Sequence, residues 1–298
     1  MLELRLMGGL GNQMSQVAFG YYISRLTNQK LYIDVTSYKH YKRRPCSINR
    51  MKLCKNIIVG ENAGSLFHIK SRLFQKIFHV FNHMFYKGKE MPEKFFYMCV
   101  KSGHVYSFDS KYYPISRIKK NSDIYGYFLI EKYFRKYYKE ICELFHVKDE
   151  ELSEASRYYE RLILESDEPI AISLRLQDDY VKDDTMYVCT KEYYQQGIEY
   201  LKENHPNGQY FIFADDIERA KKMNLGVQAV YIEGMTDVEG MHLMSKCHHF
   251  LISNSSFSWW GAYLSQKERK QIVVPDHWIN NAKDYSDKYY EGMIKIEC

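Results

Sequence analysis

The stretch MGGLGNQMSQ, residues 7–16, decides how the first part of this sequence is expected to fold. It follows a short apolar segment, residues 2–6, and leads into an amphipathic segment that continues to about residue 26. A strand, a glycine turn and a helix in this order present backbone N–H groups and a helix N-terminus to an anion. Together with a second apolar segment at residues 30–34, the pattern predicts a βαβ unit with an anion site at its turn.

The glycine turn matches neither of the common nucleotide motifs. Gly9 and Gly11 fit the first two glycines of G-x-G-x-x-G, but Met14 stands at the third, and no Gly-Lys-Ser or Gly-Lys-Thr follows. A tight turn without a ligand is one interpretation. The adjacent amides of Asn12 and Gln13 favour the other, a site for a polar ligand, and make these four loop residues binding candidates.

Composition bounds the class of protein. The 298 residues are 45% hydrophobic and 27% charged, which is typical of a water-soluble globular chain of about two domains. The net charge of +5 favours a small anionic ligand and is too weak to indicate duplex DNA, so no nucleic-acid partner is expected. The seven cysteines lack metal-binding spacing, which predicts reduced thiols and no metal site.

Two further features concern membranes and sugars. The sequence has no signal peptide and no apolar run that approaches about 18 residues, which favours a cytoplasmic protein. The aromatic run IFHVFNHMFY, residues 77–86, is interpreted either as a buried helix face or as a segment on a membrane surface. The 28 tyrosines suit sugar-binding or interfacial surfaces, although many of them can equally be core residues.

The second part of the chain alternates clearly between strands and helices. From residue 169 onward, buried-strand patterns such as residues 169–176 and 209–216 alternate with amphipathic helical patterns such as residues 191–208. This alternation predicts a parallel, doubly wound sheet. The fold class is therefore α/β, with a domain boundary near residue 165.

Polar residues gather where these expected strands end, which is the edge at which such sheets bind ligands. They are Arg175, Gln177 and Asp178 after the first strand, Asp215 and Asp216 after the second, and Asn254, Ser255 and Ser256 after a later one. With the glycine turn, these clusters are expected to converge on one ligand cleft.

Each cluster has a chemical and a structural interpretation. Arg175 can bind a pyrophosphate with two parallel hydrogen bonds or form a structural ion pair. A carboxylate such as Asp215 can accept hydrogen bonds from a guanine edge, whereas Asp216 can cap a helix. The hydroxyls of Ser255 and Ser256 open a helix, where phosphate binds well. The set predicts a nucleoside diphosphate site and a nucleotide-sugar glycosyltransferase.

Four motifs resemble one known family. GGLGNQMSQVAFGYYIS, residues 8–24, resembles the opening signature of the α-1,2-fucosyltransferases of glycosyltransferase family 11. YGYFLIEKYF at residues 125–134, FIFADDIE at 211–218 and ISNSSFSWWGAYLS at 252–265 are similar to its later motifs, in the same order. The resemblance covers nearly the whole chain, and its first and last motifs are long and specific.

The resemblance implies a GT-B fold, two Rossmann-like domains facing across a cleft. Residues 1–165 would form an acceptor-side domain, and residues 166–298 would bind GDP-L-fucose as the donor, without a metal or another cofactor. The implied reaction moves L-fucose, with inversion, to the 2-hydroxyl of a terminal galactoside, as in bacterial O-antigen or other surface-glycan synthesis. The acceptor is left open between a free and a lipid-linked glycan, which allows peripheral contact with the inner face of the membrane.

The resemblance also assigns roles to residues. Arg175 would hold the pyrophosphate and stabilise its charge during catalysis, Asp215 would read the guanine, and Ser255, Ser256 and Phe257 would hold the phosphates beside Asn254. The loop from Gly9 to Gln13 would close on the diphosphate. The general base is a separate hypothesis, which does not come from the resemblance: Asp178 is the first choice, and Asp179, Asp34 and Glu131 are alternatives among which the sequence does not decide.

One motif departs from the family pattern H-[VI]-R-R-G-D-Y. This sequence reads SLRLQDDY at residues 173–180, so Ser173 replaces the histidine and Leu176 replaces the second arginine. Ser173 is kept as a candidate donor contact. The departure leaves open a nucleotide- or glycan-binding homologue with impaired catalysis, and a transferase that uses another GDP-sugar. A nicotinamide dehydrogenase is a third interpretation, against which Met14 argues.

Overall fold

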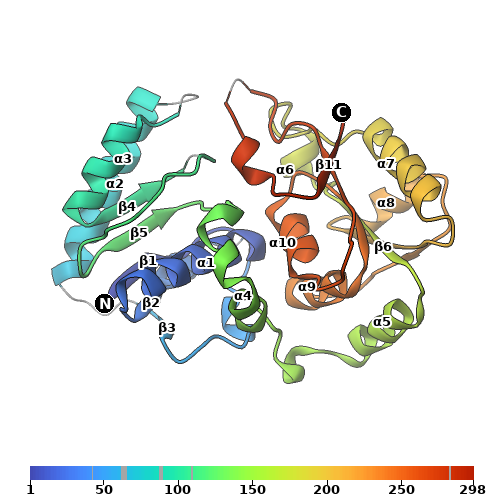
Figure 1. Ribbon diagram of the computed structural model, residues 1–298, viewed down its shortest axis with the longest axis horizontal. Helices are drawn as coiled ribbons and strands as arrows, with labels where there is room; N and C mark the ends of the chain where they lie inside the picture. The colour runs from blue at the N-terminus through green and yellow to red at the C-terminus, as the bar shows by residue number, and fades with distance from the viewer. Residues whose placement is uncertain (42, 62–65, 87–89, 109, 282) are drawn as a thin grey trace. The chain divides into compact units, whose positions relative to one another are not determined.

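The computed structural model describes residues 1–298 except 42, 62–65, 87–89, 109 and 282, and it forms two compact units (Figure 1). The first comprises Met1–Phe145 with Ala282–Tyr289, and the second His146–Asn281 with Tyr290–Cys298. The boundary between the two units lies after Phe145 and not near residue 165. Helix α5 (Glu154–Glu165) belongs to the second unit, because it packs against α9 (Asp237–Lys246) of that unit.

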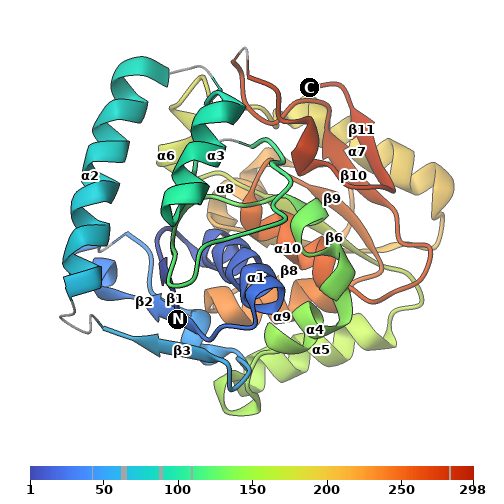
Figure 2. The ribbon, with the colours of Figure 1, turned by 60° about the vertical axis from the view of Figure 1, so that its left-hand side comes forward.

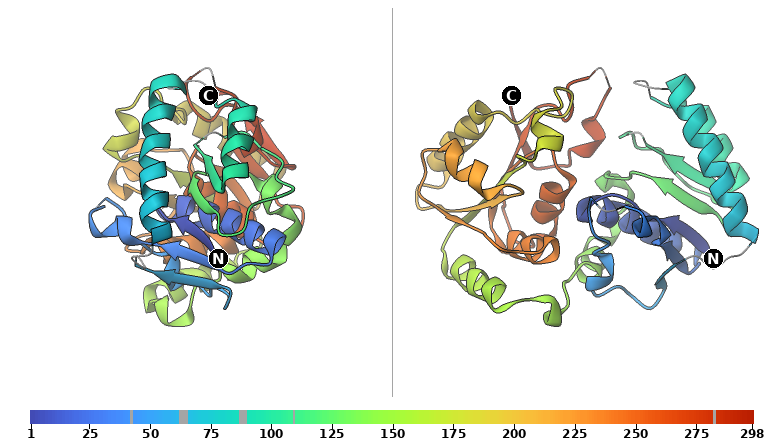
Figure 3. Two further views of the ribbon diagram at one scale, coloured as in Figure 1. Left: turned by 90° about the vertical axis from the view of Figure 1, so that its left-hand side faces the viewer. Right: turned by 180° about the vertical axis from the view of Figure 1, so that it is seen from behind.

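The first unit is built on a parallel sheet in the order β3-β2-β1-β5-β4. Its strands are β1 (Leu2–Arg5), β2 (Leu31–Asp34), β3 (Ile57–Gly60), β4 (His104–Ser107) and β5 (Asp123–Gly126). Its helices are α1 (Leu10–Thr27), α2 (Leu66–Tyr86), α3 (Glu93–Ser102) and α4 (Tyr138–Leu144). Helix α1 covers one face of the sheet, and α2 and α3 cover the other, as the end-on view in Figure 3 also shows.

The second unit has a parallel sheet in the order β11-β10-β9-β6-β7-β8. Its strands are β6 (Pro169–Leu174), β7 (Gln209–Ala214), β8 (Ala229–Tyr231), β9 (His249–Ile252), β10 (Ile272–Pro275) and β11 (Met293–Ile296). Its other helices are α6 (Asp178–Val181), α7 (Lys191–Asn204), α8 (Ile217–Met223) and α10 (Ser256–Leu264). Helices α7 and α8 lie on one face, and α9 and α10 on the other (Figures 1 and 2).

The burial of strand β6 explains why the sequence of the second unit predicts its strands well. All six residues of β6 are buried, because the strand lies between β7 and β9 in the middle of the sheet. Central parallel strands are covered on both faces and are therefore continuously apolar. The expected α/β class with two Rossmann-like units is confirmed.

The sequence of residues 35–120 has no clear alternation of strand and helix patterns. It contains β3, β4, α2 and α3, and its strands are only four residues long. The buried helix face expected for residues 77–86 is wrong for Ile77, Val80 and Met84, which are exposed, whereas Phe78 is buried.

Candidate functional site

Arg175 directly follows β6 at the carboxyl edge of the second sheet. Its Nη2 atom lies 3.3 Å from Oδ2 of Asp179, and its guanidinium lies 5.1 Å from the centre of the buried Tyr180 ring. The side chain remains 26% exposed. An ion pair at such exposure contributes little in water, so a phosphate group can compete for the guanidinium. Arg175 therefore forms an ion pair, as its structural interpretation expected, and Asp179 is the partner.

Asp178 contacts two other cations. Its carboxylate lies 2.7 Å from Nζ of Lys182 and 2.5 Å from Nη2 of Arg219. The hydrogen bond from Lys182, followed by that from Arg219, lowers the pKa of Asp178 below its usual value. Since a general base works best with a pKa near the operating pH, this geometry favours an anchoring role for Asp178 over the expected role as base.

The alternative bases are also engaged in structural contacts. The carboxylate of Asp34 is 1% exposed and lies 3.2 Å from Arg72, while Glu131 lies 2.9 Å from Arg135. Asp179 pairs with Arg175, as described above. The choice among the four carboxylates stays a prediction.

Asp215 clamps the loop that carries Arg175. Its Oδ1 atom accepts hydrogen bonds from the backbone N–H groups of Leu176, at 2.6 Å, and Gln177, at 3.2 Å. The Gln177 side chain donates to the backbone oxygen of Asp215 at 3.1 Å. The neighbouring Asp216 caps α8 through the backbone N–H of Arg219, as its structural interpretation expected. Asp215 therefore has an evident structural role beside the expected role in guanine recognition.

Helix α10 begins at the same edge of the sheet. Ser255 is its N-cap, and the Ser255 side chain accepts a hydrogen bond from the backbone N–H of Phe257 at 3.2 Å. Ser256 and Phe257 form the first turn and are partly exposed. Asn254 is 2% exposed; its side chain accepts from the Tyr180 hydroxyl and donates to the backbone oxygen of Trp278. The Asn254 side chain thus joins loops, while the α10 turn offers backbone N–H groups to an anion.

The two departures from the family motif lie in the interior. Ser173 is 4% exposed, and its hydroxyl lies 2.6 Å from that of Ser258 on α10. Leu176 is 3% exposed and belongs to the hydrophobic core. However, Arg219 reaches from α8 to the Leu176 backbone oxygen at 2.7 Å, so a second guanidinium lies beside this loop. Sequence reasoning missed Arg219, because it lies outside the matched motifs.

In the first unit, Gln13 holds the glycine loop. The Gln13 side chain is fully buried, and its Nε2 atom donates to the backbone oxygens of Gly8, at 3.0 Å, and Pro45, at 2.8 Å. Its Oε1 atom accepts from the backbone N–H groups of Ser47 and Ile48. The expected ligand-binding role of Gln13 is therefore accompanied by a structural one.

The rest of the loop has the geometry that its glycines require. Gly8 has a φ of +82°, which favours glycine, and Gly9 is the N-cap of α1. Gly11 is buried in the first turn, whereas the Asn12 side chain is partly exposed. Of the two amides, Asn12 is the better candidate for contact with a ligand.

An open cavity of about 390 Å³ adjoins the glycine loop within the first unit. It is lined by Met7, Gly8, Ser37, His40, Tyr41 and Tyr127. Tyr127 belongs to the YGYF motif, and this motif together with the abundance of tyrosine was the available signal for a site here. Tyrosine rings and hydroxyls suit the faces and hydroxyl groups of a sugar.

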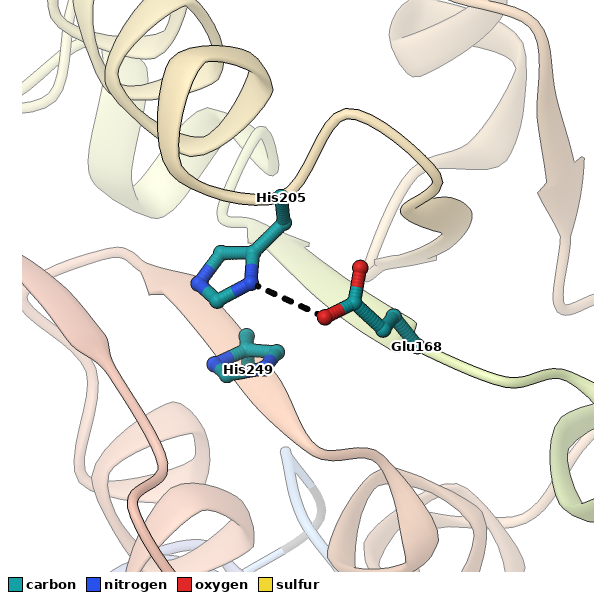
Figure 4. Close-up of side chains that lie close together, drawn as sticks. All are labelled: Glu168, His205 and His249. Atoms are coloured by element: carbon teal, nitrogen blue, oxygen red, sulfur yellow. Dashed lines mark hydrogen bonds and ion pairs between the residues drawn. The ribbon is translucent and has the colours of Figure 1, made fainter.

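Among the described residues, two side-chain clusters contain metal-ligating residue types. Figure 4 shows Glu168, His205 and His249, in which Nδ1 of His205 lies 3.3 Å from a Glu168 oxygen. The two imidazole rings are stacked, with centres 3.6 Å apart. Since a ring nitrogen binds a metal in the plane of its ring, both rings would have to turn to share an ion.

The second cluster comprises Asp276, His277 and Cys298. The Cys298 sulfur lies 3.1 Å from Asp276 and 3.5 Å from Nδ1 of His277. Burial first, and then its hydrogen bond to Asp276, raise the pKa of the Cys298 thiol to about 12. Metal binding would require the thiolate form of Cys298. The metal-free donor site stays a prediction.

Comparison with known proteins gives the class of the molecule. The sequence profile of Glycosyl transferase family 11 matches residues 1–296. The α-1,2-colitosyltransferase of Escherichia coli is 28% identical, with 98% of each chain covered. The O-antigen biosynthesis glycosyltransferase WbnK of Escherichia coli is 25% identical, with 92% of this chain and 93% of the relative covered.

Solved structures support the fold. NodZ α-1,6-fucosyltransferase soaked with GDP-fucose is similar with a TM-score of 0.54 and 11% identity, over 95% of this chain and 97% of NodZ. A fucosyltransferase NodZ structure from Bradyrhizobium gives a TM-score of 0.55 and 13% identity, over 92% and 94% of the two chains. The expected GT-B fold class is confirmed by this likeness.

The fold and the match over residues 1–296 define a glycosyltransferase. The chain belongs to glycosyltransferase family 11.

Proposed function

We propose that this protein transfers L-fucose from GDP-L-fucose to the 2-hydroxyl of a terminal galactoside, with inversion at the anomeric carbon. The product would be part of a bacterial O-antigen or another surface glycan, assembled in the cytoplasm. Support comes from the family and from relatives whose names specify an α-1,2 linkage and O-antigen synthesis.

The observation that carries the proposal is the shared sheet edge of the second unit. Arg175 follows β6, Asp215 follows β7 and the first turn of α10 follows β9, and these three strands are neighbours in the sheet. Arg175 and the N–H groups of the α10 turn are suited to a diphosphate. The proposed guanine contact of Asp215 would add base selectivity to the same edge.

In the proposed reaction, the bond between the sugar C1 and the β-phosphate oxygen breaks, and its electron pair leaves with GDP. Arg175 and the α10 N-terminus stabilise the charge that grows on the departing phosphate. The acceptor oxygen forms its bond to C1 on the opposite face, and its proton passes to solvent or to a carboxylate. Arg219, paired with Asp178 and Asp216, brings a second guanidinium to this edge, where the family motif has a second arginine.

The first unit is assigned to the acceptor in this proposal. Its open cavity presents Tyr41, Tyr127 and His40 beside the glycine loop. Aromatic faces bind the apolar faces of sugars, and the tyrosine hydroxyls can pair with sugar hydroxyls. Galactose is the proposed sugar at this position, on a free or a lipid-linked glycan.

A second candidate function differs only in the sugar transferred. The 28% identical relative is an α-1,2-colitosyltransferase, so transfer of colitose from a GDP-linked donor is the specific alternative. Both candidates share the nucleotide and the linkage, and they differ in the contacts made by the sugar.

A donor competition assay tests the proposal. The purified protein is incubated with a β-galactoside and either GDP-fucose or GDP-colitose, and the product linkage is determined by NMR. The proposal expects a fucosyl-α-1,2-galactoside and a higher kcat/KM for GDP-fucose. Preference for GDP-colitose would establish the second candidate, while GDP binding without any transfer would indicate an impaired homologue.

A further inference from the structure

Helix α2 turns an apolar row of side chains outward. Leu73, Ile77, Val80 and Met84 are 61%, 57%, 57% and 69% exposed. At 3.6 residues per turn, these positions fall within about 60° of one another, so they form one continuous row, called the α2 stripe below. In Figures 1 and 3, α2 lies on the side of its sheet opposite to α1.

The contacts that hold α2 against its sheet are made by residues outside the α2 stripe. Ser71 and Gln75 are buried, and both reach the buried carboxylate of Asp123 on β5, Ser71 at 2.7 Å and Gln75 at 3.4 Å. Phe78 is 3% exposed and stacks edge-on against Tyr106 of β4. A surface helix normally packs its apolar side and exposes its polar side. Here polar and aromatic contacts fix α2, and four aliphatic or thioether side chains face outward, which marks an interaction surface.

The charges around the stripe identify the kind of partner. The sequence of α2 contains Lys70, Arg72 and Lys76 and no Asp or Glu. Lys70 and Lys76 are exposed and stand three residues before and after Leu73, so they flank the stripe at about 60° on either side. Lysines in this position can extend toward lipid phosphates while apolar neighbours enter the acyl region. The protein as a whole is also positive, at +5.

We propose that the α2 stripe lies on the surface of an anionic lipid bilayer. Leu73, Ile77, Val80 and Met84 enter the boundary between headgroups and acyl chains, and the two flanking lysines contact anionic headgroups. No helix among the described residues is both long and apolar enough to cross a membrane. The proposed attachment depends on neither the donor nor the acceptor site.

Vesicle co-sedimentation of the full chain tests this proposal. Binding is measured to vesicles of phosphatidylcholine alone and to vesicles with about 30% phosphatidylglycerol, the range in which basic segments respond to surface charge. One variant, Ile77→Ser/Val80→Ser, shortens the stripe, and another, Lys70→Glu/Lys76→Glu, reverses the flanking charges. Leu26→Ser/Leu164→Ser removes exposed apolar side chains elsewhere, and Lys222→Glu/Lys267→Glu changes net charge equally elsewhere.

The proposal predicts binding that depends on the anionic lipid and weakens about tenfold or more in both stripe variants, with much smaller changes in both controls. Circular dichroism and Tm confirm folding, and GDP binding is measured separately on the same samples. Wild-type protein that does not sediment with anionic vesicles, or stripe and control variants that bind equally, would overturn the proposal. Sedimentation of a wild-type dimer that becomes a monomer in Ile77→Ser/Val80→Ser, without vesicle binding, would instead assign the stripe to a second copy of the chain.

Discussion

Arg219 and Asp178 form an ion pair with Nη2 and Oδ1 2.5 Å apart, and the same guanidinium binds the backbone oxygen of Leu176 at 2.7 Å. Arg219 thereby ties α8 to the loop after β6 and brings a positive charge beside the position where the family motif has its second arginine. Asp178 in turn is held by cations and does not contact Arg175. Arg175 is therefore the residue expected to bind the donor, whereas Arg219 and Asp178 hold the loop in place.

Replacing Arg175 with alanine is expected to weaken GDP binding by about 10- to 100-fold, because charge-assisted hydrogen bonds contribute about 1.5–3 kcal/mol. Arg175→Lys should fall between wild type and Arg175→Ala, since lysine keeps the charge but lacks the planar fork. Isothermal titration with GDP measures the effect, and Arg161→Ala on exposed α5 is the control. Equal affinities of Arg175→Ala and wild type would remove Arg175 from the donor site.

Replacing Asp178 with asparagine is expected to change kcat by less than about threefold. Its pKa is lowered by Lys182 and Arg219, so the carboxylate remains ionised and hydrogen-bonded throughout the neutral range and makes a weak base. The dependence of kcat on pH is compared for Asp178→Asn and wild type. Loss of the acid limb of the profile together with a fall of about 100-fold or more in kcat would restore the role of general base.

The two amide side chains of the glycine loop are expected to have different roles, Gln13 in stability and Asn12 in activity. Gln13→Ala should lower the free energy of unfolding by about 2–4 kcal/mol, because it leaves buried backbone groups without partners. Asn12→Ala, at a partly exposed position, should change it by less than about 0.5 kcal/mol but lower kcat/KM. Denaturant unfolding and transfer kinetics are measured on both variants. A strongly destabilised Asn12→Ala would contradict this division.

Glu239 is expected to make the second unit sensitive to acid. Burial raises its pKa, but hydrogen bonds from Ser153 and Thr236 outweigh that effect and bring the pKa from 4.5 to about 2. Because the folded pKa is depressed, the stabilisation is present above about pH 4.5 and is lost as pH falls toward 2. Its size is on the order of 3 kcal/mol.

Unfolding free energies between pH 7 and pH 3 test this expectation. Glu239→Gln should show a smaller loss of stability over that range than wild type, while the exposed Glu218→Gln serves as the control. A Glu239→Gln variant with the same pH dependence as wild type would exclude this carboxyl as the source.

The sequence was sufficient to predict the second unit well, for a physical reason. Its buried strands, such as β6, are continuously apolar, and the helices between them are amphipathic, so each element has a distinct local signal. Helix α2 was different, because the aromatic run at residues 77–86 left open whether its side chains are buried or lie on a surface. Only the contacts of Ser71 and Gln75 with Asp123 show that its apolar side faces outward.

The candidate site was predictable in its residues but not in their partners. Arg175, Asp215 and Ser255 were expected at one sheet edge because each follows an expected strand, and in the structure they follow β6, β7 and β9 of one parallel sheet. Whether Asp178 or Asp179 pairs with Arg175 depends on side-chain directions in the short α6 helix, which spacing does not determine. Arg219 became visible only through its contact with Leu176, 43 positions away in the chain.

Isothermal titration of the purified protein with GDP, with UDP and ADP as controls and each with and without EDTA, shows whether this sheet edge binds a GDP-linked donor. We expect selective GDP binding that survives EDTA, and a loss of selectivity over ADP in Asp215→Asn, which can still accept the backbone hydrogen bonds of the loop. Equal binding of the three nucleotides, or no binding of GDP, would contradict a GDP-sugar site at this sheet edge.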